Sequence, residues 1–454
     1  MLLDQPDFRR RRVLNWLLAG AMYAFFYMAR YNFTAIAGPL ATTFGWSNTQ
    51  VGFFSSATLV YGASVFLNGP LADRIGGRRA ILFGAVGTAL CNLAFGFGHL
   101  FVAEPAVWAG AGTAKHVVTP ASMRFGLSGS NVTMILLGVW VVNFYFQSFG
   151  AAAIVKINAA WFHVRERGVF SGIFGVLIRA GLLLAFAGVP YIVTKLPWQW
   201  AFWVPSSCIA VLVALNYLFV RDTPEDAGFE PLDTGDGGED DEPGPSALKD
   251  VLRKVFASTT MWTIALGSMM IGFVRRSVVD DWWPKYFSNV YPSDTTAPKV
   301  AAWGIAIAGI VGGLAFGAWS DRGFRGRRAP VVVIGFVAQA IVLLVFGLLD
   351  RGHAPGVASA CSLVVLSFFV NGSHGMVGGA ASMDFGGKKA AATAAGLFDG
   401  VQYVAGGIIG VTLGKLIDTR GWGIWPFVPI PFAVAGAVVM ARLWNVLPGR
   451  RAAH

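Results

Sequence analysis

The sequence is short of charge. Only 13% of its 454 residues are Asp, Glu, Lys or Arg, whereas about a quarter is usual in a soluble domain. This shortage excludes an ordinary soluble enzyme or binding module of this length. Cysteine is also scarce: Cys91, Cys208 and Cys361 all lie in apolar runs, which excludes a disulfide framework. Segments of about ten residues with alternating polarity are missing, and this excludes a porin-type barrel.

The sequence is rich in long hydrophobic runs. Hydrophobic residues make up 55% of the chain, and the mean hydropathy is +0.59. Many apolar runs reach about 20 residues, the length that crosses ~30 Å of hydrocarbon. We therefore predict an all-α membrane protein with twelve transmembrane helices in two six-helix halves, embedded in a lipid bilayer. The spans are expected near residues 13–36, 51–72, 80–102, 132–160, 168–192, 199–220, 259–280, 299–320, 329–349, 356–380, 390–416 and 426–446.

The net charge of +11 does not indicate a nucleic-acid partner, because the cations are spread over short loops between apolar runs. With the N-terminus inside, Lys and Arg are roughly three times as frequent in the predicted inner segments as in the outer ones. We therefore expect a multi-pass protein of the inner (plasma) membrane with both termini cytoplasmic. We expect it to function as a monomer.

One segment interrupts the apolar pattern after the sixth span. Residues 221–258 are rich in acidic residues, Gly and Pro, and such a segment cannot bury enough apolar surface to fold alone. The predicted organisation is an N-terminal six-helix half (1–220), a cytoplasmic linker (221–258) and a C-terminal six-helix half (259–454). We assign no role to the outer loop 103–131.

A motif occurs twice, after the second and the eighth spans. Residues 69–79 and 317–328 both contain Gly-x-x-x-Asp-Arg and end in Gly-Arg-Arg, and Asp73 and Asp321 are 248 positions apart. The matched positions indicate a duplicated chain. The glycine is expected to allow close helix packing, and the aspartate to pair with an arginine across helix ends. We predict a gating role for Asp73, Arg74, Arg79, Asp321, Arg322 and Lys156; alternatively, the motif residues only set topology.

Two arginines occupy equivalent places in this duplication. Arg30 lies inside a long apolar run, 43 residues before Asp73, and Arg276 lies in another run, 45 residues before Asp321. A guanidinium in hydrocarbon costs at least ~2.5–3.5 kcal/mol on insertion scales, so it needs a partner, a cavity or a ligand. Where two halves meet, an unneutralised pair of this kind forms a bidentate site for a phosphate dianion. The alternative is a structural ion pair with Asp281 or Asp399.

These features resemble the major facilitator superfamily, and specifically its organophosphate:inorganic phosphate antiporter family. The resemblance covers nearly the whole chain and is carried by residues 27–33, 61–62, 166–168, 221–228, 276 with 281–282, and 388–396. It implies that Arg30 and Arg276 bind phosphate. It also implies that four tyrosines line the substrate cavity: Tyr23, Tyr27, Tyr61 and Tyr403.

The chain departs from that family at several cavity positions. Tyr31, Val65 and Ile178 stand where similar proteins often have Lys or His, and Phe273 and Asn371 replace tyrosines. Other polar residues stand nearby, and we expect the substrate to meet Arg179, Asn371, His374 and Asp399. The first of these would supply the missing positive charge. Asp399 would pair with a cavity cation or carry a proton, and His374 would be a packed polar residue or a proton carrier.

No metal cluster, nucleophile–base pair or phosphate-binding Gly-Lys loop is present in the sequence. We therefore predict a protein that is not an enzyme and needs no cofactor. The predicted function is secondary active exchange of an organic phosphate ester for inorganic phosphate by rocker-switch alternating access. Two alternatives are a sugar-phosphate membrane receptor that signals to a partner, and a proton-coupled transporter of another organic anion. The sequence does not choose the organic phosphate.

Overall fold

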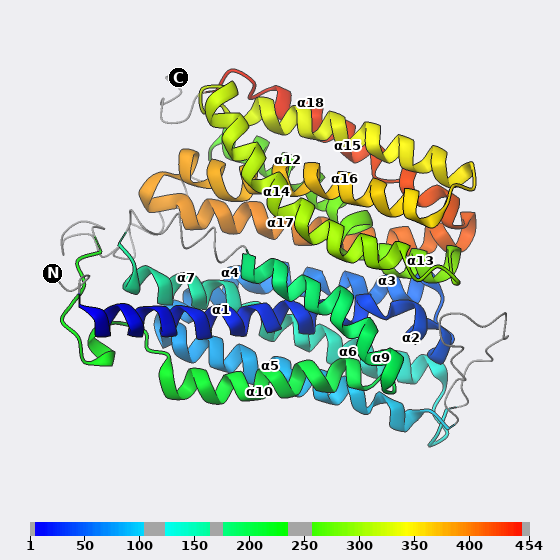
Figure 1. The fold of residues 1–454 in the computed structure, drawn as a ribbon, viewed down its shortest axis with the longest axis horizontal. Helices are drawn as coiled ribbons and strands as arrows, with labels where there is room; N and C mark the ends of the chain where they lie inside the picture. Colours follow the sequence, from blue (N-terminus) through cyan, green and yellow to red (C-terminus); the bar gives the residue numbers. More distant parts are fainter. Residues whose placement is uncertain (1–4, 104–122, 164–175, 235–256, 447–454) are drawn as a thin grey trace.

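The computed structural model describes residues 5–103, 123–163, 176–234 and 257–446, without the side chains of Asp73, residues 382–395 and a few other helical positions. These residues are almost entirely helical, and the one extended pairing among them is the isolated bridge between Val102 and Met123. Figure 1 shows two bundles of helices lying side by side. The all-α prediction is confirmed for the part of the chain that the structure describes.

The first bundle, here called the N-half, precedes residue 220. Its long apolar runs form helices because, without water, the backbone N–H and C=O groups must form hydrogen bonds with each other, and a helix allows this within one segment. Its main elements are α1 (Pro6–Ala35), α2 (Ala37–Phe44), α3 (Asn48–Ser56), α4 (Thr58–Ile75), α5 (Gly77–Gly96), α6 (Gly129–Gln147), α7 (Phe149–Trp161), η3 (Leu184–Gly188), α9 (Val189–Lys195) and α10 (Trp200–Phe219).

The second bundle, the C-half, follows residue 258. Its elements are α12 (Thr259–Val274), η6 (Arg275–Asp280), α13 (Trp283–Val290), α14 (Ala297–Gly323), α15 (Arg328–Arg351), α16 (Gly356–His374), η7 (Gly375–Ala381), α17 (Ser382–Arg420), η8 (Trp422–Phe427) and α18 (Ile430–Ala441). We call the contact surface between the halves the seam. The end of the molecule where α1 begins is the terminal end, and the opposite end, near α2, α3 and α13, is the distal end (Figure 1).

Nine helices among the described residues are long and apolar enough to cross a membrane. The three other predicted spans are helical as well: α1 covers the first, α3 and α4 cover the second, and α12 with η6 covers the seventh. The predicted set of twelve spans therefore fits the observed helices.

Three spans contain a π-helical segment. These wider turns cover Leu184–Gly188, Arg275–Asp280 and Gly375–Ala381. Short π segments inside α-helices are rare and occur frequently at functional sites. Here one of them contains Arg276, so the irregular backbone coincides with a predicted ligand residue.

The distal end of the seam is tightly packed. A Cβ at Gly52 of α3 would lie 2.5 Å from the carbonyl oxygen of Gly410 on α17, so the two helices meet backbone to backbone. Asp418, near the end of α17, accepts hydrogen bonds from the backbone nitrogens of Asn48 (2.9 Å) and Thr49 (2.8 Å) at the start of α3. A carboxylate at a helix N-terminus is stabilising. The two halves are thus joined at their distal end.

Candidate functional site

Arg30 lies in α1 and is only 1% exposed. Its Nε donates to Oε1 of Gln147 at 2.7 Å, and its Nη1 donates to the hydroxyl of Tyr403 on α17 at 3.2 Å. Nη2 is buried and has no hydrogen-bond partner among the described residues. No described carboxylate lies within 4.0 Å of this guanidinium. Arg30 is therefore a buried cation that the described residues do not neutralise, with one donor group left for an anion.

A chain of buried amides holds Arg30 in position. Asn32 donates to Asn92 at 2.8 Å, Asn92 donates to Asn143 at 3.2 Å, and Gln147 donates to Asn143 at 3.3 Å. The chain links α1, α5 and α6 and ends on the oxygen that accepts from Arg30. Buried polar networks of this kind rigidify the side chains that belong to them. The N-half therefore presents this guanidinium in a fixed orientation.

The four predicted cavity tyrosines come together around Arg30. The rings of Tyr27 and Tyr61 lie 4.7 and 4.3 Å from its Cζ atom. The ring of Tyr403 lies 4.4 Å from that of Tyr61, and the ring of Tyr23 lies 5.3 Å from that of Tyr27. Aromatic faces attract a cation but carry no net charge. This cage stabilises the guanidinium and leaves its full charge available to a ligand.

Arg276 has a different environment, although it is also nearly buried at 4% exposure. Its Nη2 lies 3.0 Å from Oδ2 of Asp281, and its Nη1 lies 3.7 Å from Oδ2 of Asp280. The ion pair with Asp281 is the alternative that the sequence left open for this arginine. The expectation that both arginines are unneutralised is therefore wrong for Arg276, because the turn that follows it brings two carboxylates onto its guanidinium.

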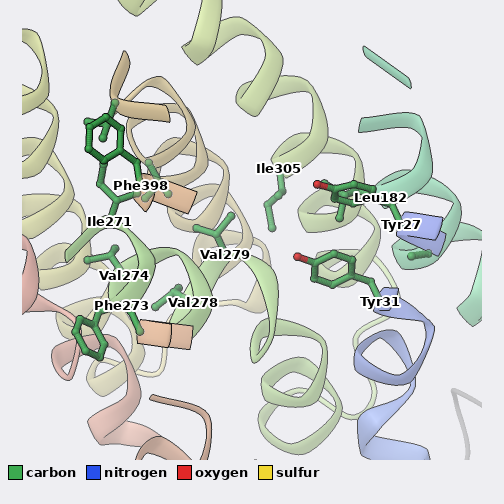
Figure 2. Packing of buried hydrophobic residues seen from close by; sticks show 14 of the residues in the cluster. Tyr27, Tyr31, Leu182, Ile271, Phe273, Val274, Val278, Val279, Ile305 and Phe398 are labelled. Atoms are coloured by element: carbon green, nitrogen blue, oxygen red, sulfur yellow. The ribbon is translucent and has the colours of Figure 1, made fainter. Parts of the chain in front are cut away.

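Each of the two arginines reaches across the seam to a tyrosine. Arg276 of the C-half donates to the hydroxyl of Tyr31 at 2.7 Å, and Arg30 of the N-half donates to Tyr403. Figure 2 shows Tyr27 and Tyr31 one turn apart on α1, with both hydroxyls directed toward the C-half. The structure therefore brings the repeat-related arginines to the same seam.

Arg275, the neighbour of Arg276, belongs to a second polar cluster. Its Nε lies 2.9 Å from Oδ2 of Asp280, and its Nη1 lies 3.4 Å from Nε2 of His374. Nδ1 of His374 lies 3.0 Å from Nε2 of Gln402. His374 is thus a packed polar residue in this structure, and its role in proton transfer stays a prediction.

Asp399 lies on α17, four residues before Tyr403, and is exposed. It forms no ion pair within 4.0 Å with any described residue. The expectation that it pairs with a cavity cation is therefore wrong for the described residues, in which Arg275 pairs with Asp280 instead. A carboxylate in the middle of a long apolar helix is costly unless it faces water or a partner, so we expect Asp399 to face a solvent-accessible space on the terminal side of Tyr403.

Arg179 and Asn371 meet across the seam. Arg179 lies in the span Val176–Lys195 and donates from Nη2 to Oδ1 of Asn371 on α16. Nδ2 of Asn371 is committed to the carbonyl oxygen of Ser367 at 2.9 Å. No described carboxylate lies within 4.0 Å of Arg179. It is therefore a second cation on the seam without a described counter-ion.

Comparison with protein families agrees with this architecture. Residues 19–411 match the Major Facilitator Superfamily. The chain belongs to this superfamily. A solved structure, the partially occluded inward open conformation of the xylose transporter XylE from E. coli, has a TM-score of 0.70 at 15% identity and covers 97% of this chain and 99% of that one. This similarity confirms the predicted major facilitator fold of twelve helices in two halves.

Curated relatives of this major facilitator span almost its full length. It is 29% identical to the glycerol-3-phosphate transporter of Bacillus subtilis (95% of this chain, 91% of that protein). It is 24% identical to the membrane sensor protein UhpC of Escherichia coli (96% and 92%) and 23% identical to a probable hexose phosphate transport protein of Chlamydia trachomatis (98% and 93%). These relatives confirm the resemblance drawn from the sequence and the prediction that the chain is not an enzyme.

In the second copy of the repeated motif, residues 317–328, the structure describes the side chains of both Asp321 and Arg328. Oδ1 of Asp321 lies 2.6 Å from Nη1 of Arg328 and joins the end of α14 to the start of α15, which is the predicted type of pairing. A Cβ at Gly317 would meet only the methyl carbon of Met376, at 3.8 Å. The expectation that this glycine allows unusually close packing is therefore wrong, since ordinary van der Waals space remains.

Three other predicted gating residues, Arg74, Arg79 and Arg322, lie at helix ends. All three are exposed, and Lys156 is half-buried on α7. The side chain of Asp73 lies outside the described residues. So do residues 166–168 and the side chains of 388–395, which carried part of the family resemblance.

Several residues of the seam site were not predicted from the sequence. Gln147 was not considered, although an amide four residues after Asn143 within an apolar span is a signal for buried hydrogen bonding. Tyr31 was noted only as a departure from related proteins. Asp280 and Arg275 were not assigned, because their pairing depends on the π-helical turn, which no local pattern announces.

Proposed function

We propose that this protein exchanges an organic phosphate ester for inorganic phosphate across the inner (plasma) membrane. Both termini would be cytoplasmic and the monomer would be the working unit. The observation that carries the proposal is the guanidinium of Arg30, which is buried and unneutralised, with Nη2 unpaired among the described residues. Burying a cation without its counter-ion is costly. A phosphate dianion supplies both the charge and the acceptor oxygens that this group lacks.

Arg276 would join the ligand by exchanging partners. In the absence of phosphate it holds Asp281 at 3.0 Å. A phosphate bound at Arg30 is doubly charged and can displace this carboxylate, so that both guanidiniums share the ligand. Because each arginine belongs to a different half, the ligand would then bridge the seam.

Alternating access follows from the same electrostatics. Closing the halves around an unneutralised Arg30 is unfavourable, and a bound dianion removes that penalty. The halves 1–220 and 259–454 would rock about the seam, with 221–258 as their linker. Support for an entry from the terminal end comes from the packed contact between Asp418 and α3 at the distal end and from the exposed Asp399.

The relatives support the substrate class. Their names specify glycerol-3-phosphate and hexose phosphate, and each match covers more than nine-tenths of this chain. The shared chemistry of these ligands is a phosphate monoester. The phosphate group would be held by the arginines of the seam, and the organic part would distinguish one member from another.

Counterflow in proteoliposomes tests this proposal. Vesicles loaded with unlabelled phosphate should accumulate labelled phosphate, and external organic phosphates should compete with it. Uptake that requires a pH gradient but no internal phosphate would contradict the proposal and favour a proton-coupled anion transporter.

A second candidate function is that of a membrane receptor for a sugar phosphate. The observation that favours it is the full-length similarity to a protein named as a membrane sensor. A receptor would bind organic phosphate in a calorimeter and show no exchange in the counterflow assay. Exchange above the level of protein-free vesicles would count against the receptor.

A further inference from the structure

A small pocket lies on the seam beside the arginines. Two charged side chains, Arg179 and Asp280, stand at its border, and its remaining walls are apolar: Leu182, Phe186, Val279, Ala302, Ile305 and Ala306. The ring of Phe186, one of these walls, lies 5.6 Å from the ring of Tyr31. In Figure 2 the hydroxyls of Tyr27 and Tyr31 point toward Ile305, another wall of the pocket. The pocket therefore adjoins the tyrosines that contact Arg30 and Arg276.

The arginines of the seam differ in whether a carboxylate neutralises their charge. Arg275 and Arg276 each have a carboxylate within 3.0 Å, whereas Arg179 has none within 4.0 Å among the described residues. Its described partner is the neutral amide oxygen of Asn371. A guanidinium has five N–H donors and binds a carboxylate through two parallel hydrogen bonds. Arg179 can therefore accept an anionic partner at the border of the pocket.

The neighbouring backbone keeps this guanidinium at the pocket. A Cβ at Gly309 of α14 would lie 3.0 Å from Cζ of Arg179 and 3.1 Å from Nδ2 of Asn371. The glycine thus leaves the space that the guanidinium fills against the C-half. The charge is held at a fixed place between the halves, and it is not a mobile surface side chain.

We propose that this pocket receives the organic end of the substrate, and that Arg179 binds a carboxylate there. The transported ester would then be a phosphorylated short-chain acid rather than the phosphate of a neutral polyol. The inference rests on the proposed exchange of phosphate esters. A carboxylate neutralises Arg179, whereas a hydroxyl leaves its charge uncompensated when the halves close. The apolar walls contact the carbon skeleton, and Asp280 accepts from a hydroxyl on it.

Two probes that differ at one carbon test the inference. 3-Phosphoglycerate carries a carboxylate where glycerol 3-phosphate carries a hydroxymethyl group. In proteoliposomes that exchange labelled phosphate, 3-phosphoglycerate should compete about tenfold or more better than glycerol 3-phosphate, since charge-assisted pairing is the stronger. The variant Arg179→Gln should reduce this ratio to about one, and Arg179→Lys should leave a part of it.

Control variants separate the possible outcomes. Arg10→Gln, at an exposed position of α1, should leave the ratio unchanged. Gly309→Ala, which displaces the guanidinium without removing it, should lower the ratio. If the protein exchanges phosphate with equal preference for the two probes, this inference is overturned while the proposed function stands. If it exchanges no phosphate, the proposed function fails as well. An unchanged ratio in Arg179→Gln would also overturn the inference, because the preference would then come from another group.

Discussion

The guanidinium of Arg276 donates a 2.7 Å hydrogen bond to Tyr31, the residue that follows Arg30 in the chain. Arg30 in turn donates to Tyr403 on the opposite half. Each of the two repeat-related arginines therefore donates a hydrogen bond across the seam to a tyrosine hydroxyl of the other half. Their charges are not equivalent, since Arg276 has a carboxylate at 3.0 Å and Arg30 has none within 4.0 Å among the described residues.

The hydroxyl of Tyr403 should matter more for stability than that of Tyr61. Both rings lie near Arg30, but the structure gives a hydrogen bond to this guanidinium only for Tyr403. Tyr403→Phe should destabilise the substrate-free protein by about 1–3 kcal/mol, because a buried donor loses its acceptor. Tyr61→Phe keeps the ring and should change stability little. Thermal unfolding in detergent compares the two, and equal shifts would contradict the assignment.

Asp281 should compete with phosphate for Arg276. Asp281→Asn removes the charge at 3.0 Å from its guanidinium, so phosphate should bind about tenfold more tightly, equivalent to about 1.4 kcal/mol. Exchange should become slower, because the tighter complex releases its ligand less often. Calorimetry measures the affinity, and Asp7→Asn, at an exposed position in the first turn of α1, is the matched control. Weaker phosphate binding in Asp281→Asn would show that this carboxylate has another role.

Asp418 should keep the distal end closed. Its two oxygens accept from the backbone nitrogens of Asn48 and Thr49. Asp418→Asn turns one acceptor into a donor and should weaken this contact by about 1 kcal/mol or more. Ser56, which donates to the carbonyl oxygen of Gly407 across the seam, can be replaced by Cys as a reporter in a chain whose native cysteines are changed to Ser.

A membrane-impermeant maleimide should then label Ser56→Cys several times faster in the Asp418→Asn background. Labelling from the outside would agree with the predicted cytoplasmic termini. An unchanged rate would mean that the packed glycines of α3 and α17 close this end without the carboxylate.

The sequence was most informative where polarity contrasts with an apolar run. Arg30 and Arg276 stand out in this way, and the repeat placed them in equivalent spans. The twelve helices followed from apolar length for the same reason. The partners of these arginines could not be predicted from the sequence in the same way. Gln147 and Tyr31 are neutral residues in helices, and their contacts with the arginines depend on how the helices pack against each other.

The local backbone explains the clearest error. The π-helical turn Arg275–Asp280 brings Asp280 and Asp281 onto neighbouring arginines. Sequence periodicity assumes a regular helix, so it offered Asp281 only as one alternative partner and did not assign Asp280. Asp399 illustrates the reverse case: this conspicuous carboxylate forms no ion pair with a described residue, whereas Asp280, which the sequence did not single out, pairs with Arg275.

The most direct test of the account is exchange of labelled phosphate by purified protein and by Arg30→Lys in matched proteoliposomes. Lysine keeps the charge but loses the planar donors that bind phosphate oxygens in pairs. The account predicts that Arg30→Lys lowers the exchange rate by about a hundredfold or more, whereas Arg10→Lys at the exposed start of α1 leaves it unchanged. Exchange by Arg30→Lys at the parent rate would contradict the assignment of the phosphate site.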